Sequence, residues 1–429
     1  MNKQLLIIFF ILNFSIVYAE DNLKFYLQKA FENNLQLNAE RKQLESAKQN
    51  KNISRSEFLP NITISGDQTS TTSTNRTNQS GSILPDTNQD SENKSISLEQ
   101  KIFSGFKGVN TFKKSDMETQ RAKLKLFEKE QKTILDTAFA YYDLIYKSKN
   151  EKFNISNVNL FERQVEFDNA RLQKGEITLT DLAQSESSLA GAKANLIKAK
   201  TELSSSKSNF ERVTREQTPD IANLKDKVFL KLPNSLASSI ELSKSKNISI
   251  LISKLEYDIS SKEYEIEKAR LSPSASIEVS KSESNEFSST IDQKDDETVK
   301  ATITWPIIKG GENISSIKKS SFDKQRAQLL LQDTKNKIVT EISNSWSNYQ
   351  SLKSVLEATK AQLRAAELAN EGITLEYDSG NTRTTLELIQ SRSLLLNARI
   401  TYAKAERDFI ISQFELANQL GSLSVKSIK

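Results

Sequence analysis

The 429-residue sequence contains no cysteine and no histidine. Without cysteine, the chain has no disulfide framework and no N-terminal cysteine that could carry a lipid. Without either residue, the most common general base, the thiol nucleophile and the usual zinc ligands are all missing. The acidic run Asp295–Glu297 is expected to lie in a polar loop, solvated rather than bound to a metal. The sequence therefore predicts no enzyme activity, no cofactor and no metal site.

Apolar residues, glycine and proline are also scarce. Hydrophobic residues make up 36% of the chain, which has 11 glycines and 6 prolines. This is lean for a globular core of this length and is typical of long, partly solvated helices. The first residues, "MNKQLLIIFFILNFSIVYAE", are the exception. Residues 1–19 are predicted to be a secretory signal peptide, with an N-terminal anchor helix as the alternative. No later stretch approaches eighteen apolar residues, so no transmembrane helix is predicted.

The chain also has no large excess of charge of one sign. The 60 basic and 55 acidic residues leave a net charge of +5 and are interleaved along the chain. Proteins that bind nucleic acid usually gather their lysines and arginines on one face or stripe. Because no such stripe is visible, we expect no nucleic-acid partner.

The sequence contains an internal duplication. Residues of the same kind recur at matching distances: Asn34 and Pro60, like Asn247 and Pro273, are 26 apart, while Gly105 and Gly175, like Gly310 and Gly380, are 70 apart. We predict a first structural repeat over residues 20–220 and a second over residues 221–429. The two repeats differ in length within the polar segment 67–93, where a loop tolerates insertion.

Each repeat contains two long proline-free segments with helical spacing. Ile338, Ile342, Trp346, Tyr349 and Leu352, for example, follow one another at steps of three or four. The segments predict helices over residues 108–174 and 178–217 in the first repeat, and over 312–376 and 384–420 in the second. A helix from 108 to 174 would be about 100 Å long. Helices of this length must pack side by side as an extended coiled bundle.

Four shorter segments alternate between apolar and polar residues, as in Ile62 and Ile64 among Asn61, Thr63 and Ser65. Period two predicts strands, here over residues 59–67, 95–103, 274–281 and 298–306. In an exported protein this pattern fits a β-barrel wall, with a soluble antiparallel sheet packed on helices as the alternative. Four strands are too few to close a barrel, whose practical minimum is about eight. Three copies would supply twelve.

Several quoted segments carry a family resemblance: "FLPNITIS", "SLEQKIFSGF" against "TITWPIIKGG", and "GEITLTDLAQSESSLAGAKANL" against "GNTRTTLELIQSRSLLLNARITYAKAERDFIISQFELANQLGSL". Their order, duplication and spacing resemble the TolC family of outer-membrane channel proteins over essentially the whole mature chain. The resemblance implies a mainly α fold with a small transmembrane β part. It further implies a homotrimer, with a twelve-stranded barrel in outer-membrane lipid and a twelve-helix barrel through the periplasm.

The same resemblance implies partners and a function. A periplasmic adaptor protein and an inner-membrane pump would dock at the far end of the helical barrel. Drugs, toxins or secreted proteins would then leave through the bore, as in multidrug efflux or type I secretion. The alternative from another class is a periplasmic or surface coiled-coil structural protein without a channel.

The long helices are interrupted at equivalent places in the two repeats. Each interruption predicts a glycine that ends one helix in the left-handed conformation and a capping box that starts the next: Gly175 before Thr178 and Asp181, and Gly380 before Thr384 and Glu387. These local devices explain the glycines, threonines and acids. They do not explain Tyr377 or Arg383.

The resemblance assigns a role to these two residues. It implies a periplasmic gate in which Thr180 and Asp181 of the first repeat face Tyr377 and Arg383 of the second. It also places Glu387 and Gln390 at two positions that form acidic rings in the bore. Three carboxylates gathered around a threefold axis would raise one another's pKa and favour a bound cation.

Three departures from the family pattern bear on these expectations. Gln390 is uncharged, so only one charged ring is expected. One extra residue separates Gly380 from Arg383 and shifts its register. Lys101 stands where the second repeat has Pro306, and Arg215 stands where the second repeat has Gly421.

Overall fold

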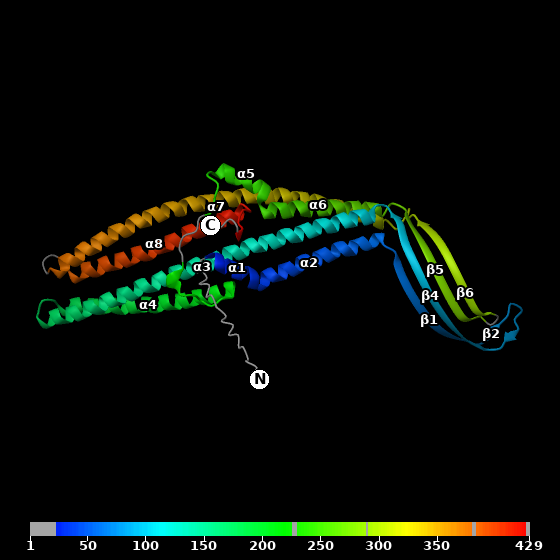
Figure 1. The fold of residues 1–429 in the computed structure, drawn as a ribbon, viewed down its shortest axis with the longest axis horizontal. Coiled ribbons are helices and arrows are strands. Elements are labelled where there is room, and N and C mark those ends of the chain that lie inside the picture. Colours follow the sequence, from blue (N-terminus) through cyan, green and yellow to red (C-terminus); the bar gives the residue numbers. More distant parts are fainter. Residues whose placement is uncertain (1–22, 225–229, 289–290, 380–382, 426–429) are drawn as a thin grey trace, which may run out of the picture. The chain divides into compact units, whose positions relative to one another are not determined.

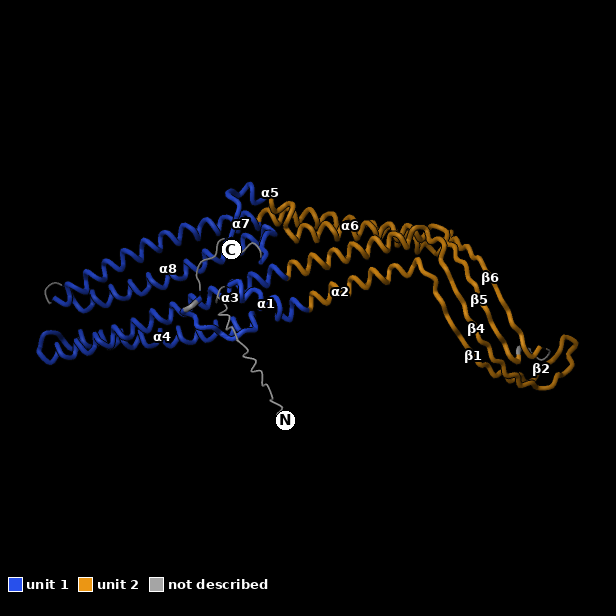
Figure 2. The backbone as a smooth tube through the Cα atoms, in the orientation of Figure 1, with its two compact units in different colours: residues 1–38, 130–240, 341–429 blue, residues 39–129, 241–340 orange. Residues whose placement is uncertain are grey.

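The computed structural model describes residues 23–224, 230–288, 291–379 and 383–425. The predicted signal peptide and Gly380 lie outside the described residues. The chain forms two compact units (Figure 2). Unit 1 comprises residues 1–38, 130–240 and 341–429, and unit 2 comprises residues 39–129 and 241–340.

Unit 2 contains an antiparallel sheet of four long strands. These are β1 (Asn61–Ser73), β4 (Thr87–Ser104), β5 (Ser274–Ser288) and β6 (Ile291–Thr304), in the order β1-β4-β5-β6 (Figure 1). The sheet therefore joins the strands of the two repeats, with β1 and β6 at its two edges. A short hairpin, β2 (Arg76–Thr77) and β3 (Ile83–Leu84), lies between β1 and β4 in the sequence.

The sheet has two unlike faces. Ile62 pairs with Leu98, Leu98 with Val279, and Val279 with Val299, so one row of branched apolar residues crosses all four strands. All four side chains are exposed in the single chain, Val299 by 75%. The adjacent row on the other face is made of hydroxyl residues, Thr63, Ser97, Ser280 and Thr298. The expected alternation is confirmed.

The strands extend well beyond the predicted segments. β1 continues to Ser73 and β4 begins at Thr87, so much of the polar segment expected to be a loop is strand. The run Asp295–Glu297, also expected in a loop, lies inside β6, where Glu297 pairs with Lys281 at 3.1 Å. Apolar alternation detects only the part of a strand that has an apolar face. The backbone ladder, which needs no apolar side chains, continues past that part.

Unit 2 also holds helix α2 (Leu35–Arg55, beginning in unit 1), helix α6 (Ile248–Ala269) and the first parts of the two longest helices. These two, α3 (Lys107–Gln173) and α7 (Glu312–Asp378), each run for 67 residues. The turn between β4 and α3 is tight. Gly105 there has φ +61°, and a Cβ on it would lie 2.4 Å from the Cβ of Ser272.

Unit 1 is helical. It contains α1 (Leu23–Asn33), α4 (Leu179–Thr214), the start of α5 (Leu236–Lys246, which ends in unit 2), α8 (Thr385–Gln419) and the later parts of α3 and α7. Within this unit α3 runs beside α4 and α7 beside α8 (Figure 1). Its core gathers α1, the middle of α3 and the ends of α4 and α8, with Tyr26, Tyr141, Phe210 and Phe414 among its largest members.

The C-terminal tail belongs to this core. Leu423 is fully buried in the same cluster as Leu224, and Gln131 donates a hydrogen bond to the Leu423 carbonyl at 3.1 Å. The segment after the α4 helix and the end of the chain therefore pack together. Within the described part of the chain, no helix has an apolar stretch sufficient to cross a membrane.

Candidate gate at the helix turns

The first helix turn in unit 1 is built as the sequence predicts. Helix α3 ends at Gln173, and Gly175 adopts a left-handed φ of +74°. The Gly175 amide donates to the Leu172 carbonyl and the Glu176 amide to the Arg171 carbonyl, both at 2.9 Å. This pair of hydrogen bonds is a Schellman cap.

Both predicted capping boxes are present. The Thr178 hydroxyl accepts from the Asp181 amide at 3.3 Å, while the Asp181 carboxylate accepts from the Thr178 amide at 3.0 Å. Thr384 and Glu387 make the same reciprocal pair at the start of α8, at 3.2 and 2.8 Å. Each pair satisfies two backbone donors that a helix start leaves free.

The capping boxes stabilise the ionised form of both acids. Hydrogen bonds from the hydroxyl and amide of Thr178 hold the pKa of Asp181 below its usual value. The amide and hydroxyl of Thr384, followed by Arg383, lower the pKa of Glu387. In the single chain Glu387 is therefore a partly exposed carboxylate bonded to Thr384 and Arg383. The mutual rise in pKa expected for three such groups around an axis stays a prediction.

Arg383 and Asp181 do not meet within one chain. Arg383 donates to the carboxylates of Glu376 at 2.6 Å and Glu387 at 3.1 Å, both in its own helical hairpin. The Asp181 carboxylate instead accepts from the amide and the hydroxyl of Thr178, at 3.0 and 2.7 Å. Thr180 is exposed in the first turn of α4, and Gln390 is exposed on α8 beside Glu387. A contact between Arg383 and Asp181 of different chains stays a prediction.

Tyr377 is placed differently from the other predicted gate residues, because its side chain is buried. Its hydroxyl donates to Asp168 on α3 at 3.0 Å. The same oxygen accepts from Gln164 and from Arg171, each at 3.0 Å. Thr385, the first residue of α8, lies 3.3 Å away. Burial raises the pKa of Tyr377, so its proton is retained.

Asp168 is the residue that the sequence analysis missed. Its carboxylate is fully buried and accepts hydrogen bonds from Gln164 at 2.9 Å and from Ser185 on α4 at 2.5 Å, besides that from Tyr377. A signal was available in the sequence. Val158, Phe161, Gln164 and Asp168 follow one another at steps of three, three and four, so two polar residues continue a buried apolar stripe.

Arg392 joins α8 to the same cluster. Its guanidinium donates to the side-chain oxygen of Gln164 at 3.0 Å, and burial lowers its pKa. The four helices α3, α4, α7 and α8 are thus connected through one set of side chains. We call Gln164, Asp168, Arg171, Ser185, Tyr377, Thr385 and Arg392 the Asp168 cluster.

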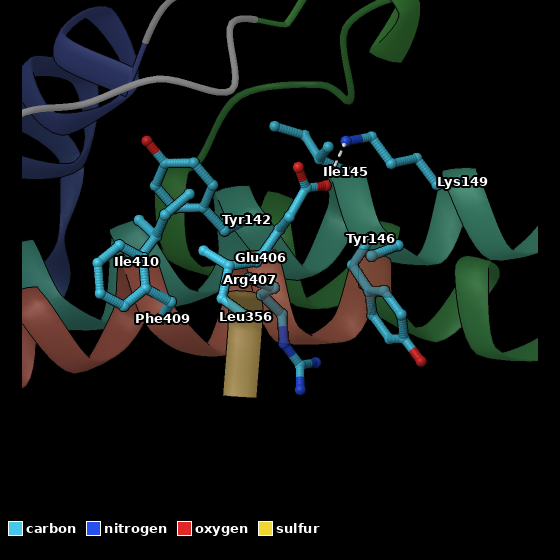
Figure 3. A pocket seen from close by; sticks show the side chains of 10 residues that line it. Tyr142, Ile145, Tyr146, Lys149, Leu356, Glu406, Arg407, Phe409 and Ile410 are labelled. Carbon is cyan, nitrogen blue, oxygen red and sulfur yellow. Dashed lines mark hydrogen bonds and ion pairs between the residues drawn. The ribbon is translucent and has the colours of Figure 1, made fainter. Parts of the chain in front are cut away.

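A cavity of about 220 Å³ lies elsewhere in unit 1, between α3, α7 and α8 (Figure 3). Figure 3 shows Lys149 reaching toward Glu406 across the cavity, a 3.4 Å ion pair. Arg407, also in its lining, pairs with Asp143 at 2.6 Å. These ion pairs connect α3 to α8. Among the residues that the structure describes, no group of acidic side chains is arranged to hold a metal.

Comparison with known proteins decides the family. The model of the outer membrane efflux protein family matches residues 26–214 and 240–422. The chain belongs to this family. The outer membrane efflux protein BepC of Brucella suis is 25% identical over 94% of this chain and 86% of its own length. The outer membrane protein TolC of Vibrio cholerae is 23% identical over 96% and 93%.

Solved structures share the fold. The CmeC outer membrane channel of Campylobacter jejuni matches with a TM-score of 0.80 and 16% identity, over 93% of this chain and 85% of that one. The outer membrane protein VceC of Vibrio cholerae gives 0.76 and 18%, over 93% and 96%. The chain is therefore an outer-membrane efflux protein whose family and fold are those of channels rather than enzymes. Membership also favours the barrel-wall interpretation of the sheet.

Replacing glycine by alanine is expected to have opposite effects on stability at Gly175, in the turn, and at Gly191, inside a helix. Gly175→Ala should destabilise the protein by about 1 kcal/mol, because alanine is strained at a positive φ although no atom lies near the added Cβ. Gly191→Ala, in the interior of α4 and equally open, should stabilise it by about 0.5–1 kcal/mol. Thermal unfolding of the purified proteins at one heating rate measures both. Equal shifts of the same sign would contradict this account of the turn.

The capping boxes predict a pH dependence. The pKa values of Asp181 and Glu387 are lowered by folding, so their stabilisation is complete above the ordinary carboxyl pKa. It is lost as the pH falls through the lowered values, that is, below about pH 4. Amide hydrogen exchange at the starts of α4 and α8, corrected for intrinsic rates, should accelerate there and stay constant between pH 5 and 7. Asp181→Asn with Glu387→Gln should remove most of this acid response.

Proposed function

We propose that the chain is the outer-membrane exit duct of a tripartite efflux pump or a type I secretion system. In this proposal, three copies form the duct, a periplasmic adaptor protein and an inner-membrane pump dock to it, and its periplasmic end is gated. The observation that carries the proposal is the sheet of unit 2, which exposes an apolar row on one face and a hydroxyl row on the other.

The unlike faces support a barrel that separates lipid from water. The apolar row from Ile62 to Val299 suits hydrocarbon, and the hydroxyl row from Thr63 to Thr298 suits a wet bore. A structural coiled coil without a channel would have no use for a lipid-facing row. An exposed row of this kind on a soluble protein would promote aggregation.

The two sheet edges support closure by identical copies. Among the described strands, β1 and β6 each have one neighbour, so each leaves an open edge of the sheet in the single chain. In hydrocarbon each unpaired group costs several kcal/mol, which open edges cannot sustain. Pairing β6 of one copy with β1 of the next gives a closed ring. Three copies give twelve strands, enough to enclose a bore.

This proposal predicts conductance and a face-dependent tolerance of charge. Purified protein added to a planar lipid bilayer should insert and pass ions. Val299→Lys should reduce insertion, because a lysine facing the bilayer midplane costs about 2–4 kcal/mol. Thr298→Lys, one residue away on the hydroxyl face, should insert as the wild type does. A monomeric product in micelles, or a bilayer that stays silent, would refute the proposed function.

A second prediction concerns the gate between copies. Arg383→Ser and Asp181→Ala should each make the channel leakier, because an ion pair between neighbouring copies would favour the closed state. Single-channel recording and the entry of large antibiotics into cells measure the leak. Unchanged conductance together with unchanged antibiotic entry would remove Arg383 and Asp181 from the gate. The conductance of the wild-type protein would still stand.

A further inference from the structure

The Asp168 cluster contains more than the gate residues chosen from sequence. It combines a fully buried carboxylate with donors from other helices, Ser185 of α4 and Tyr377 of α7. Asp181, the acid expected at the gate, is partly exposed and bonded only within its own helix start. Of these two acids, therefore, Asp168 is the one that bonds across helices within one chain.

We propose that Asp168 is a positioning residue of the gate, whose carboxylate holds Tyr377 and so keeps the α7–α8 hairpin against the α3–α4 hairpin in the closed channel. The inference rests on the proposed function, since it takes the duct to be gated at these turns. It adds a link inside each copy to the expected contact between copies.

The arrangement of donors supports this role. An ionised carboxylate only accepts hydrogen bonds, and all three polar groups on Asp168 donate to it. The Tyr377 hydroxyl donates its single proton in the hydrogen bond to Asp168, and its oxygen accepts from Gln164 and Arg171. The acceptor oxygens of Asp168 thereby set Gln164, Ser185 and Tyr377 as the donors. Removing that charge removes the reason for Tyr377 to point into α3.

Burial makes the link strong but breakable. Hydrogen bonds to a charged acceptor are about twice as strong as neutral ones, and they strengthen where water is excluded. Moving α7 away from α3 separates Tyr377 from Asp168 and leaves a carboxylate that must be solvated. Opening therefore requires water to enter the cluster. A partner that binds the open form can supply the free energy for this change.

Tyr377 also connects the link to the turn itself. It lies one residue before the end of α7, and its hydroxyl is 3.3 Å from the hydroxyl of Thr385, the first residue of α8. Arg392, about two turns further along α8, reaches the same cluster through Gln164. Both helices of the second hairpin are thus tied to α3, so the hairpin would move as one body when the link breaks.

The test is the open probability of single channels in a planar bilayer, measured for Asp168→Asn, Tyr377→Phe and the double variant. Each single change should raise the ratio of open to closed time by roughly tenfold or more, the factor expected for one hydrogen bond to a charged group. Because Asp168 acts through Tyr377, the double variant should match the stronger single variant. A carboxylate that only stabilises the helices would give multiplied effects.

Glu166→Gln is the matched control. It removes the same charge two residues away on the exposed side of α3 and should leave the open probability unchanged. If Asp168→Asn fails to assemble, Tyr377→Phe, which keeps the ring, still tests the link. Wild-type open probability in Tyr377→Phe, or multiplied effects in the double variant, would overturn the inference alone. A wild-type protein that never conducts would overturn the proposed function instead.

Discussion

Backbone pairing in lipid is the constraint on which the other features depend. In the described part of one chain, the sheet ends at β1 and β6, strands of 13 and 14 residues whose outer edges have no neighbouring strand. No water is present in hydrocarbon to satisfy those groups. The chain therefore encodes one third of a proposed barrel wall, and its edges set how copies join.

The duplicated sequence uses the same local helix-capping motifs in both repeats. The two capping boxes have the same residue spacing and nearly the same bond lengths. Arg215 shows that the left-handed helix end is kept even where the residue is not glycine. It ends α4 at φ +60°, and Gly421 follows α8 at +67°. The exchange of glycine for arginine was visible in the sequence, and the left-handed conformation is conserved between the repeats despite its strain.

Local rules explain why much of the fold could be predicted from sequence. The glycine cap at Gly175 and the boxes at Thr178 and Thr384 depend on contacts within a few residues, which spacing reveals directly. The ends of β1 and β4 could not be predicted in this way. Their outer parts, as at Thr71 and Gln89, are polar on both faces and are held by backbone pairing together with polar side-chain bonds, such as that from Gln89 to the Glu286 carbonyl. The periodicity that identifies a strand is absent from such a segment.

The Asp168 cluster was hidden for a different reason. Its bonds join residues that are 17 and 209 positions apart, and they exist only after the helices have packed. Sequence analysis found Tyr377 because a turn did not require it, but the tyrosine alone did not identify its partner. A polar residue in a buried helical stripe was the clue. Its meaning depends on which donors the neighbouring helices bring to it.

Such a polar cluster has a task that apolar packing performs poorly. Ala365, Ala366 and Ala369 of α7 line the seam with α8 together with larger apolar residues, Ile373 and Leu394. Contacts of this kind are weakly directional, so helices could slide or tilt along them at little cost. A buried charge is costly unless every donor is in place, and it therefore selects one register among many similar ones. The same dependence on complete geometry makes the selected state fail as a unit once one donor is withdrawn. The proposed gate, which would hold the helical turns closed and release them when a partner binds, needs both properties.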